Sequence, residues 1–231
     1  MLSRTRAIVL HLAHHKDNAD ILHLYTKDFG RVNMMIYGVG GRKNMLTKAV
    51  LAPLNIIGVD SHFDRAEAIQ RVNAQAIDLI YSNAQTDIKR NAQIIFMAEM
   101  LYRLLRHPLA DPQLFDILEQ RIRELGNANQ NWHLSLLVEL MMSLGITPQL
   151  DAKATMLNMY TGELSRSTSR DIDHFEPEET EVLQQLLSGS QVSLSRTARQ
   201  TMLRKICRYY EIQIDGFVTP RSLEILQEVF D

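Results

Sequence analysis

A glycine-rich and basic segment has the residue types of a phosphate-binding loop. It reads FGRVNMMIYGVGGRKNM from residue 29 to residue 45. A P-loop requires G-x-x-x-x-G-K-[ST], whereas here Lys43 is followed by Asn44 and the glycines are spaced differently. A dinucleotide-binding fingerprint requires G-x-G-x-x-G at the start of a helix, and Lys43 stands where the third glycine should be. The segment therefore argues against a nucleotide cofactor and against an enzyme that uses one.

The same region carries an excess of positive charge. Five Lys or Arg residues and one Asp occur between residues 27 and 48. If the flanking segments are strands of a barrel, these cations can lie along a phosphate backbone. The alternative is a solvated hairpin whose glycines merely adopt positive φ angles. The residues alone leave both interpretations open.

Other side chains capable of chemistry have ordinary structural explanations. Four histidines near the N-terminus lack the carboxylate or cysteine partners of a typical metal site: His11, His14, His15 and His23. Tyr25 and Tyr37 lie on predicted strands, where each either stacks on a nucleic-acid base or belongs to the core. Cys207 stands among apolar residues and is expected to be buried and unreactive. The motifs G-x-S-x-G and H-E-x-x-H are absent, so the sequence predicts no catalytic site.

A predicted helix near the C-terminus is the most basic helix of its half of the chain. Between residues 193 and 210 there is no acid, and the cations are Arg196, Arg199, Arg204, Lys205 and Arg208. Such a band is either a binding surface or a solvated helix face, and the sequence does not decide between them.

The overall charge is distributed unevenly. The net charge is −2, but residues 1–80 contain ten Lys or Arg against seven Asp or Glu, and the remainder is acidic. This asymmetry favours a polyanionic partner for the first part. A single cysteine excludes a disulfide within the chain and disfavours a cysteine-based zinc site. Without a signal peptide pattern or a long apolar stretch, a cytoplasmic, nucleoid-associated protein is expected.

The first third of the chain has the alternation of β-strands. Short, polar or glycine-containing joins separate them, and the last segment is either a strand or a short helix. The segments are 6–15, 19–26, 31–38, 50–62 and 66–77. Five short antiparallel strands in about 80 residues predict a small barrel of the oligonucleotide/oligosaccharide-binding (OB) type.

From about residue 83 the apolar spacing becomes helical. Helices are predicted within 89–107, 111–125, 131–145, 176–189, 193–214 and 219–230. Residues 149–175 lack a strong period and are expected to form an irregular subdomain. The prediction is an α+β protein, with an OB-fold DNA-binding domain at 1–80 and an α-helical bundle domain at 81–231. An irregular loop subdomain is expected at about 148–175.

The order of these features resembles the bacterial recombination-repair family RecO. The resemblance rests on AIVLHLAHHKDNADILHLYTKDFGRVNMMIYGVGGRKN near the start, on LFDILEQRIREL and LLVELMMSLGITPQLD, and on YYEIQIDGFVTPRSLEIL near the end. Each motif is moderately specific, but together they span essentially the whole chain.

The resemblance implies a non-enzymatic protein that binds single- and double-stranded DNA, anneals complementary strands and needs no cofactor. It further implies work with RecR, and in many species RecF, to help RecA replace single-stranded DNA-binding protein. We expect phosphate contacts from Arg31, Arg42, Lys43 and Lys48, with Arg4 and Lys27 as weaker candidates. For the acidic, phenylalanine-ended tail of single-stranded DNA-binding protein, the expected receptor residues are Arg103, Arg106 and Arg121.

The chain departs from the family pattern at one place. Many members carry a four-cysteine zinc module after G-x-x-P-x-L-D, but the corresponding residues here contain no cysteine. Zinc is therefore expected to be absent, and apolar side chains are expected to hold the segment instead: Met156, Leu157, Met159, Tyr160 and Leu164.

One rival hypothesis stays open beside the DNA-binding mediator. The modest positive charge of residues 1–80 is compatible with an OB-like scaffold that binds only protein. Salt-dependent binding of DNA would distinguish the two.

Overall fold

The computed structural model describes residues 2–16, 19–37, 39, 47–64, 68–72, 76–84, 87–107, 109–150, 155–165 and 173–229. The chain forms two compact units, one of residues 1–127 with 222–229 and one that includes 128–221. The boundary predicted at residue 80 marks the change from strands to helices, but the compact units divide elsewhere. The reason is that three helices pack in the same unit as the sheet: α1 (Ile88–Leu104), α2 (Pro112–Glu124) and α6 (Ser222–Val229).

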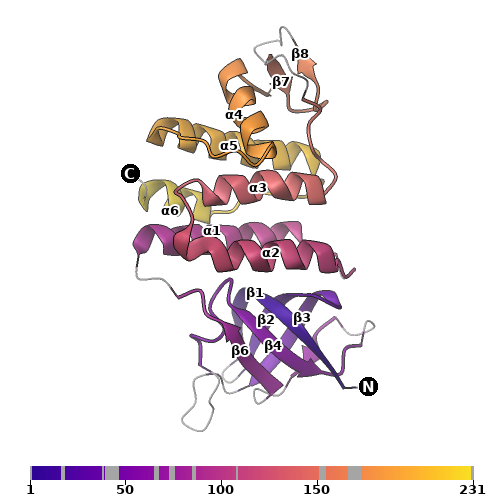
Figure 1. Cartoon of the computed structure of the whole chain (residues 1–231). Coiled ribbons are helices and arrows are strands. Elements are labelled where there is room, and N and C mark those ends of the chain that lie inside the picture. Colours follow the sequence, from indigo (N-terminus) through magenta and orange to yellow (C-terminus); the bar gives the residue numbers. More distant parts are fainter. Residues whose placement is uncertain are drawn as a thin grey trace. The chain divides into compact units, whose positions relative to one another are not determined.

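The first unit is built on a curled, six-stranded sheet (Figure 1). Its strands are β1 (Ser3–Lys16), β2 (Ala19–Thr26), β3 (Gly30–Tyr37), β4 (Ile56–Ser61), β5 (Gln70–Arg71) and β6 (Ile77–Tyr81), in the order β5-β3-β2-β1-β4-β6. All neighbours are antiparallel except β3 and β5. The predicted α+β class is confirmed, with an OB-like half-barrel of six strands instead of five. The last predicted segment, 66–77, contains only the short β5, and a sixth strand, β6, begins at its last residue and continues beyond it.

Strict alternation along β3 shows how the sequence specifies the sheet. Val32, Met34 and Ile36 are buried, whereas the residues between them are half-buried and Tyr37 is exposed. The buried set faces a core shared with the inward side chains of the other strands, such as Leu22 and Leu24 of β2. The opposite face of the sheet is therefore the one on which helices or ligands can lie.

At the start of α2 and of α6, a carboxylate accepts a hydrogen bond from a backbone N–H group of the first turn. Asp111 accepts from the N–H of Leu114, and Pro112 occupies the first turn of α2. At the start of α6, the backbone N–H and the hydroxyl of Ser222 both donate to Oε2 of Glu99 on α1. Glu99 thus anchors α6 to α1.

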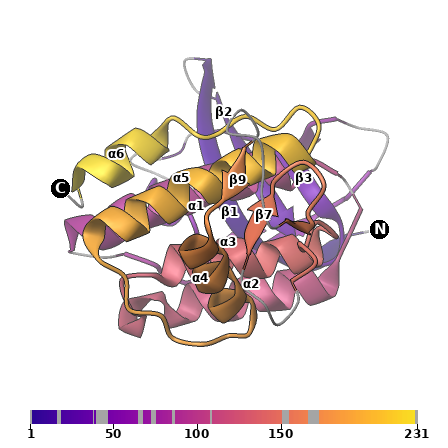
Figure 2. The ribbon, with the colours of Figure 1, turned by 90° about the horizontal axis from the view of Figure 1, so that it is seen from above.

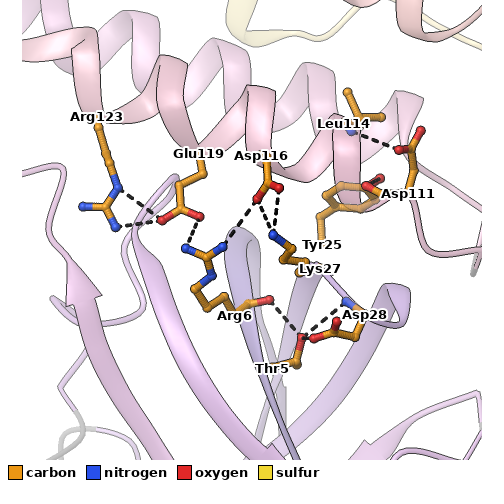
Figure 3. Close-up of polar contacts among 10 residues, drawn as sticks. All are labelled: Thr5, Arg6, Tyr25, Lys27, Asp28, Asp111, Leu114, Asp116, Glu119 and Arg123. Carbon is orange, nitrogen blue, oxygen red and sulfur yellow. Dashed lines mark hydrogen bonds and ion pairs between the residues drawn. The ribbon is translucent and has the colours of Figure 1, made fainter.

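An ion-pair cluster holds α2 against the sheet (Figure 3). Glu119 accepts from Arg6 of β1 at 2.7 Å and from Arg123 of its own helix at 2.7 Å. Lys27 donates to both oxygens of Asp116, at 2.6 and 2.7 Å. The side chain of Glu119 is only 8% exposed, so this carboxylate has lost most of its hydration and depends on the two guanidinium groups.

The second unit contains α3 (Trp132–Ser143), α4 (Pro177–Leu187) and α5 (Arg196–Gln213) (Figure 2). The segment predicted to be irregular contains a small sheet of β7 (Met156–Asn158), β8 (Leu164–Ser165) and β9 (His174–Phe175), and α4 lies beside β7 and β9.

The apolar residues predicted to hold this segment do so only in part. Leu157 and Met159 are buried together with Phe175, whereas Met156 and Leu164 are half-buried and Tyr160 is 56% exposed. Tyr160 instead directs its hydroxyl to Asp173, at 3.4 Å. The buried side chains of the small sheet pack toward the helices of the second unit, as Phe175 does against Tyr209 of α5.

The position of Glu119 yields a first prediction. Glu119→Gln keeps the shape of the side chain but leaves Arg6 and Arg123 facing a neutral amide, so the free energy of unfolding should fall by about 2 kcal/mol. Glu124→Gln is the matched control, because Glu124 is exposed on the same helix and should change stability by less than about 0.5 kcal/mol. Urea titrations compare the two variants, and equal effects would contradict the buried cluster.

Candidate nucleic-acid and peptide-binding sites

Two of the predicted phosphate-contacting cations are paired with carboxylates of the chain. Arg4 contacts Asp60 at 2.8 Å and Asp78 at 2.6 Å, and Lys27 contacts Asp116. The Arg4 guanidinium lies over Gly58, where a Cβ would stand 2.7 Å from it. Their positive charge is largely compensated locally, so contact with a phosphate would have to compete with these pairs.

Arg31 has a structural position. Its guanidinium carbon lies 4.3 Å from the centre of the Tyr102 ring, and Nη1 donates to the Tyr102 carbonyl at 3.2 Å. Burial lowers the pKa of Arg31. The backbone N–H of Arg31 also donates to the carbonyl of His107. Arg31 therefore attaches β3 to the C-terminal end of α1, and its role toward DNA stays a prediction.

The remaining predicted cations belong to the glycine-rich segment. Lys48 is exposed in a turn and makes no ion pair with the residues that the structure describes. Arg42 and Lys43 lie outside the described residues. The roles of all three residues toward DNA stay predictions.

The two candidate stacking tyrosines have different environments. Tyr25 is 3% exposed and packs against Phe115 of α2, with the ring centres 6.3 Å apart, so it is a core residue. Burial raises the pKa of its hydroxyl well above the usual value. Tyr37, at the end of β3, is 52% exposed. Of the two, only Tyr37 is accessible to a base.

Two of the four N-terminal histidines, His11 and His23, pack against each other, whereas His14 contacts Asp20. The rings of His11 and His23 stack at 5.8 Å, and both meet the edge of Tyr102. Burial lowers the pKa of His23, as do the charges of Arg31 and His11, although a hydrogen bond with Asn33 opposes this. In the part of the chain that the structure describes, no three His, Cys, Asp or Glu side chains form a group that could hold a metal ion.

A pocket of about 540 Å³ lies in the first unit beside this cluster. Its apolar walls come from three segments of the chain, and its charged side chains come from α1 and from the residues that follow this helix. The lining residues are Leu10, His11, Pro53, Ile95, Ala98, Glu99, Tyr102, Arg103 and Arg106. A site with apolar walls and adjacent guanidinium groups can receive a segment that carries both a hydrophobic side chain and carboxylates.

Two of the three predicted peptide-binding arginines line this pocket. Arg103 donates to Oε1 of Glu99 at 2.6 Å, and the Nε of Arg106 donates to the Arg103 carbonyl at 2.8 Å. Burial alone would raise the pKa of Glu99, but the bonds from Ser222 and Arg103 lower it overall. Arg121 lies on α2 and contacts Glu124 instead.

Two cations of the basic band of α5 are paired with acids. Arg208 pairs with Asp173 and Glu211, and Lys205 pairs with Glu179. Glu211 lies one turn further along α5, whereas Asp173 and Glu179 come from the segment just before α4 and from α4 itself, contacts that sequence spacing does not reveal. Beneath the band, Cys207 is buried, and burial first, with the nearby Glu211 charge, raises the pKa of its thiol to about 12. The thiol therefore stays protonated and unreactive.

Comparison with known proteins identifies the family. The model for the N-terminal part of recombination protein O matches residues 1–79, and the model for its C-terminal part matches residues 85–222. The chain belongs to the RecO family of DNA repair proteins. Members of the RecO family are recombination mediators and not enzymes, which agrees with the lack of a catalytic motif in the sequence.

Full-length relatives agree with this assignment. The chain is 25% identical to the DNA repair protein RecO of Porphyromonas gingivalis, 27% to that of Bacteroides fragilis and 26% to that of Flavobacterium psychrophilum. In each case the alignment covers 100% of both chains. Among the described residues, no helix is long and apolar enough to cross a membrane.

The environment of His23 predicts a pH dependence of stability. Because its folded-state pKa lies below the usual 6.5, the unfolded chain takes up this proton first as the pH falls. The stabilising contribution is therefore complete above about pH 6.5 and is lost as the pH falls below that value. In His23→Gln, the free energy of unfolding should decline less than in the wild type between about pH 7.5 and pH 5.5.

Urea titrations at several pH values measure this difference. His62→Gln is the control, because His62 is an exposed histidine of the same unit, and it should keep the wild-type pH dependence. A His23→Gln variant with the wild-type slope would rule out His23 as the titrating group.

Proposed function

We propose that the chain binds single- and double-stranded DNA without regard to sequence and anneals complementary strands. Together with RecR, and with RecF where that protein occurs, it would promote loading of RecA onto DNA coated by single-stranded DNA-binding protein. Membership of the RecO family carries this proposal, because both family models match and together cover nearly the whole chain. The OB-like sheet supports it, since this architecture commonly binds oligonucleotides.

We place phosphate contacts on the glycine-rich segment and on Lys48, which follows it. Arg4, Lys27 and Arg31 have intramolecular partners, whereas Lys48 is exposed. Cations on this segment would replace counterions along the strand, which gives affinity without sequence readout. Such a sequence-independent site suits annealing, where any pair of complementary strands has to be brought together.

The salt dependence of binding tests this proposal. In the double variant Arg42→Ala/Lys43→Ala, binding to a single strand of about 30 nucleotides should weaken, and the log–log salt slope should become shallower by about 1.4. Fluorescence anisotropy between about 50 and 300 mM salt measures both quantities. Arg204→Ala is the control, because it removes an exposed cation of α5 that makes no ion pair with described residues.

An unchanged slope in the double variant would remove the glycine-rich segment from the binding site. Absence of DNA binding by the wild type, even at low salt, would favour the protein-only scaffold instead. The ion pairs of Arg4, Arg6 and Lys27 favour this second candidate, because they reduce the positive charge that the sheet offers to DNA.

We further propose that the pocket of the first unit receives the acidic, phenylalanine-ended tail of single-stranded DNA-binding protein. Leu10, Pro53 and Ile95 offer an apolar wall for the terminal ring, and Arg103 and Arg106 offer donors for its carboxylates. Arg121 does not line this pocket, so its predicted role has less support than those of the other two arginines.

Titration of a labelled tail peptide tests the pocket. Arg106→Ala should weaken peptide binding about tenfold, because a charge-assisted hydrogen bond to a carboxylate is lost. Arg121→Ala removes the same charge on the neighbouring helix and should leave the affinity within about twofold of the wild type. If Arg121→Ala were the more damaging variant, the peptide would bind elsewhere.

A further inference from the structure

One half of the outward face of the sheet is left accessible by the helices. Toward the Thr26 end of β2 this face is covered, with Tyr25 against Phe115 and His23 against Tyr102. Toward the β1–β2 turn, the outward side chains are half-buried or exposed. The accessible residues, called here the outer strip, are Ala13, Ile21, Met35, Tyr37 and Arg71.

Strand register places the outer strip on one continuous surface. Ala13 pairs with Ile21, Ile21 with Met35, and Met35 with Arg71, so these four residues form one row across β1, β2, β3 and β5. Tyr37 follows two residues after Met35 and therefore projects from the same face. The row is apolar in the middle and ends at a cation.

The ring of Tyr37 lies along this surface. Its hydroxyl donates to the Sδ of Met35 at 2.9 Å, so the side chain reaches back along β3 instead of standing away from the sheet. With 52% of Tyr37 exposed, a large part of the ring remains accessible. An exposed aromatic ring on the face of a sheet is the kind of side chain on which an unpaired base stacks.

Positive charge lies at both ends of the outer strip. Arg71 is exposed beside Met35, and Lys16 is exposed at the end of β1, where its partner Ala19 pairs in turn with Tyr37. Neither cation makes an ion pair with the residues that the structure describes, and the strip itself contains no carboxylate. An exposed aromatic ring between two available cations matches a base flanked by its phosphates.

We propose that the outer strip is a base-stacking site for single-stranded DNA, in which Tyr37 stacks on a base while Lys16 and Arg71 contact the adjacent phosphates. The inference rests on the proposed DNA-binding function and adds to it a contact that distinguishes single-stranded from double-stranded DNA. Cations alone bind single and double strands alike, whereas a stacking ring needs a base whose face is open. The site therefore gives the protein a preference for unpaired DNA.

Affinities of Tyr37 variants for three DNA probes test the site. The probes are a single strand of about 30 nucleotides, the corresponding duplex, and an abasic strand that keeps the sugar–phosphate backbone but no bases. Tyr37→Ala should bind the single strand about tenfold more weakly and the duplex within about twofold of the wild type. Tyr37→Phe, which retains the ring, should bind the single strand as the wild type does.

The abasic strand isolates the stacking contact. The wild type should bind it about tenfold more weakly than the normal strand, and Tyr37→Ala should show little further loss, because the same contact is already absent. Tyr160→Ala is the matched control, since Tyr160 is a similarly exposed tyrosine in the second unit, and it should bind all three probes normally. Thermal melts check that each variant is folded.

Several outcomes would overturn the proposal. Normal single-strand affinity in Tyr37→Ala would do so, as would equal losses on single strand and duplex or a loss in Tyr37→Phe as large as that in Tyr37→Ala. These results differ from failure of the proposed function itself, in which the wild type would bind none of the three probes at low salt.

Discussion

The burial of Glu119 between two arginines is the constraint on which the first unit depends. This carboxylate can leave water only because Arg6 reaches it from β1 and Arg123 reaches it from its own helix. Together with Arg31 over Tyr102, it holds the helices against one half of the sheet. These contacts engage Arg6 and Arg31, whose charges could otherwise attract a polyanion to residues 1–80. The DNA-binding surface proposed above therefore lies on the other half of the sheet.

The covered and accessible halves of the outward face favour different ligands. At the covered half, packing of α1 over β1 leaves a pocket with apolar walls and the two guanidinium groups of Arg103 and Arg106. At the accessible half, the exposed Tyr37 and the adjacent cations lie close in sequence to the glycine-rich segment. The proposed peptide site and the proposed DNA site are therefore separate places in one unit. Glu99 belongs to the first of these and also anchors α6.

Local patterns in the sequence predicted the elements but not their long-range partners. The alternation along β3, and the Asp111–Pro112 start of α2, specify their structures through nearest neighbours, and both were predicted correctly. The parallel pairing of β5 with β3 and the burial of Glu119 depend on residues far apart in the chain, and no local pattern reports them. Arg103 and Arg106 were assigned from a helical stripe, whereas Pro53 and His11 join the pocket only through tertiary packing. The sequence also did not show which of Tyr25 and Tyr37 is buried. Tyr25 is buried because Phe115 of α2 packs against it.

Hydrogen–deuterium exchange of the full chain, with and without a single strand of about 30 nucleotides, tests most directly where DNA binds. Bound DNA should slow deuterium uptake in peptides that span β3 and residues 38–48, and in those at the β1–β2 turn. Uptake in α3 and α5 of the second unit should not change. Protection confined to the second unit, or identical uptake in both samples under conditions where DNA is bound, would contradict a DNA-binding surface on the accessible half of the sheet.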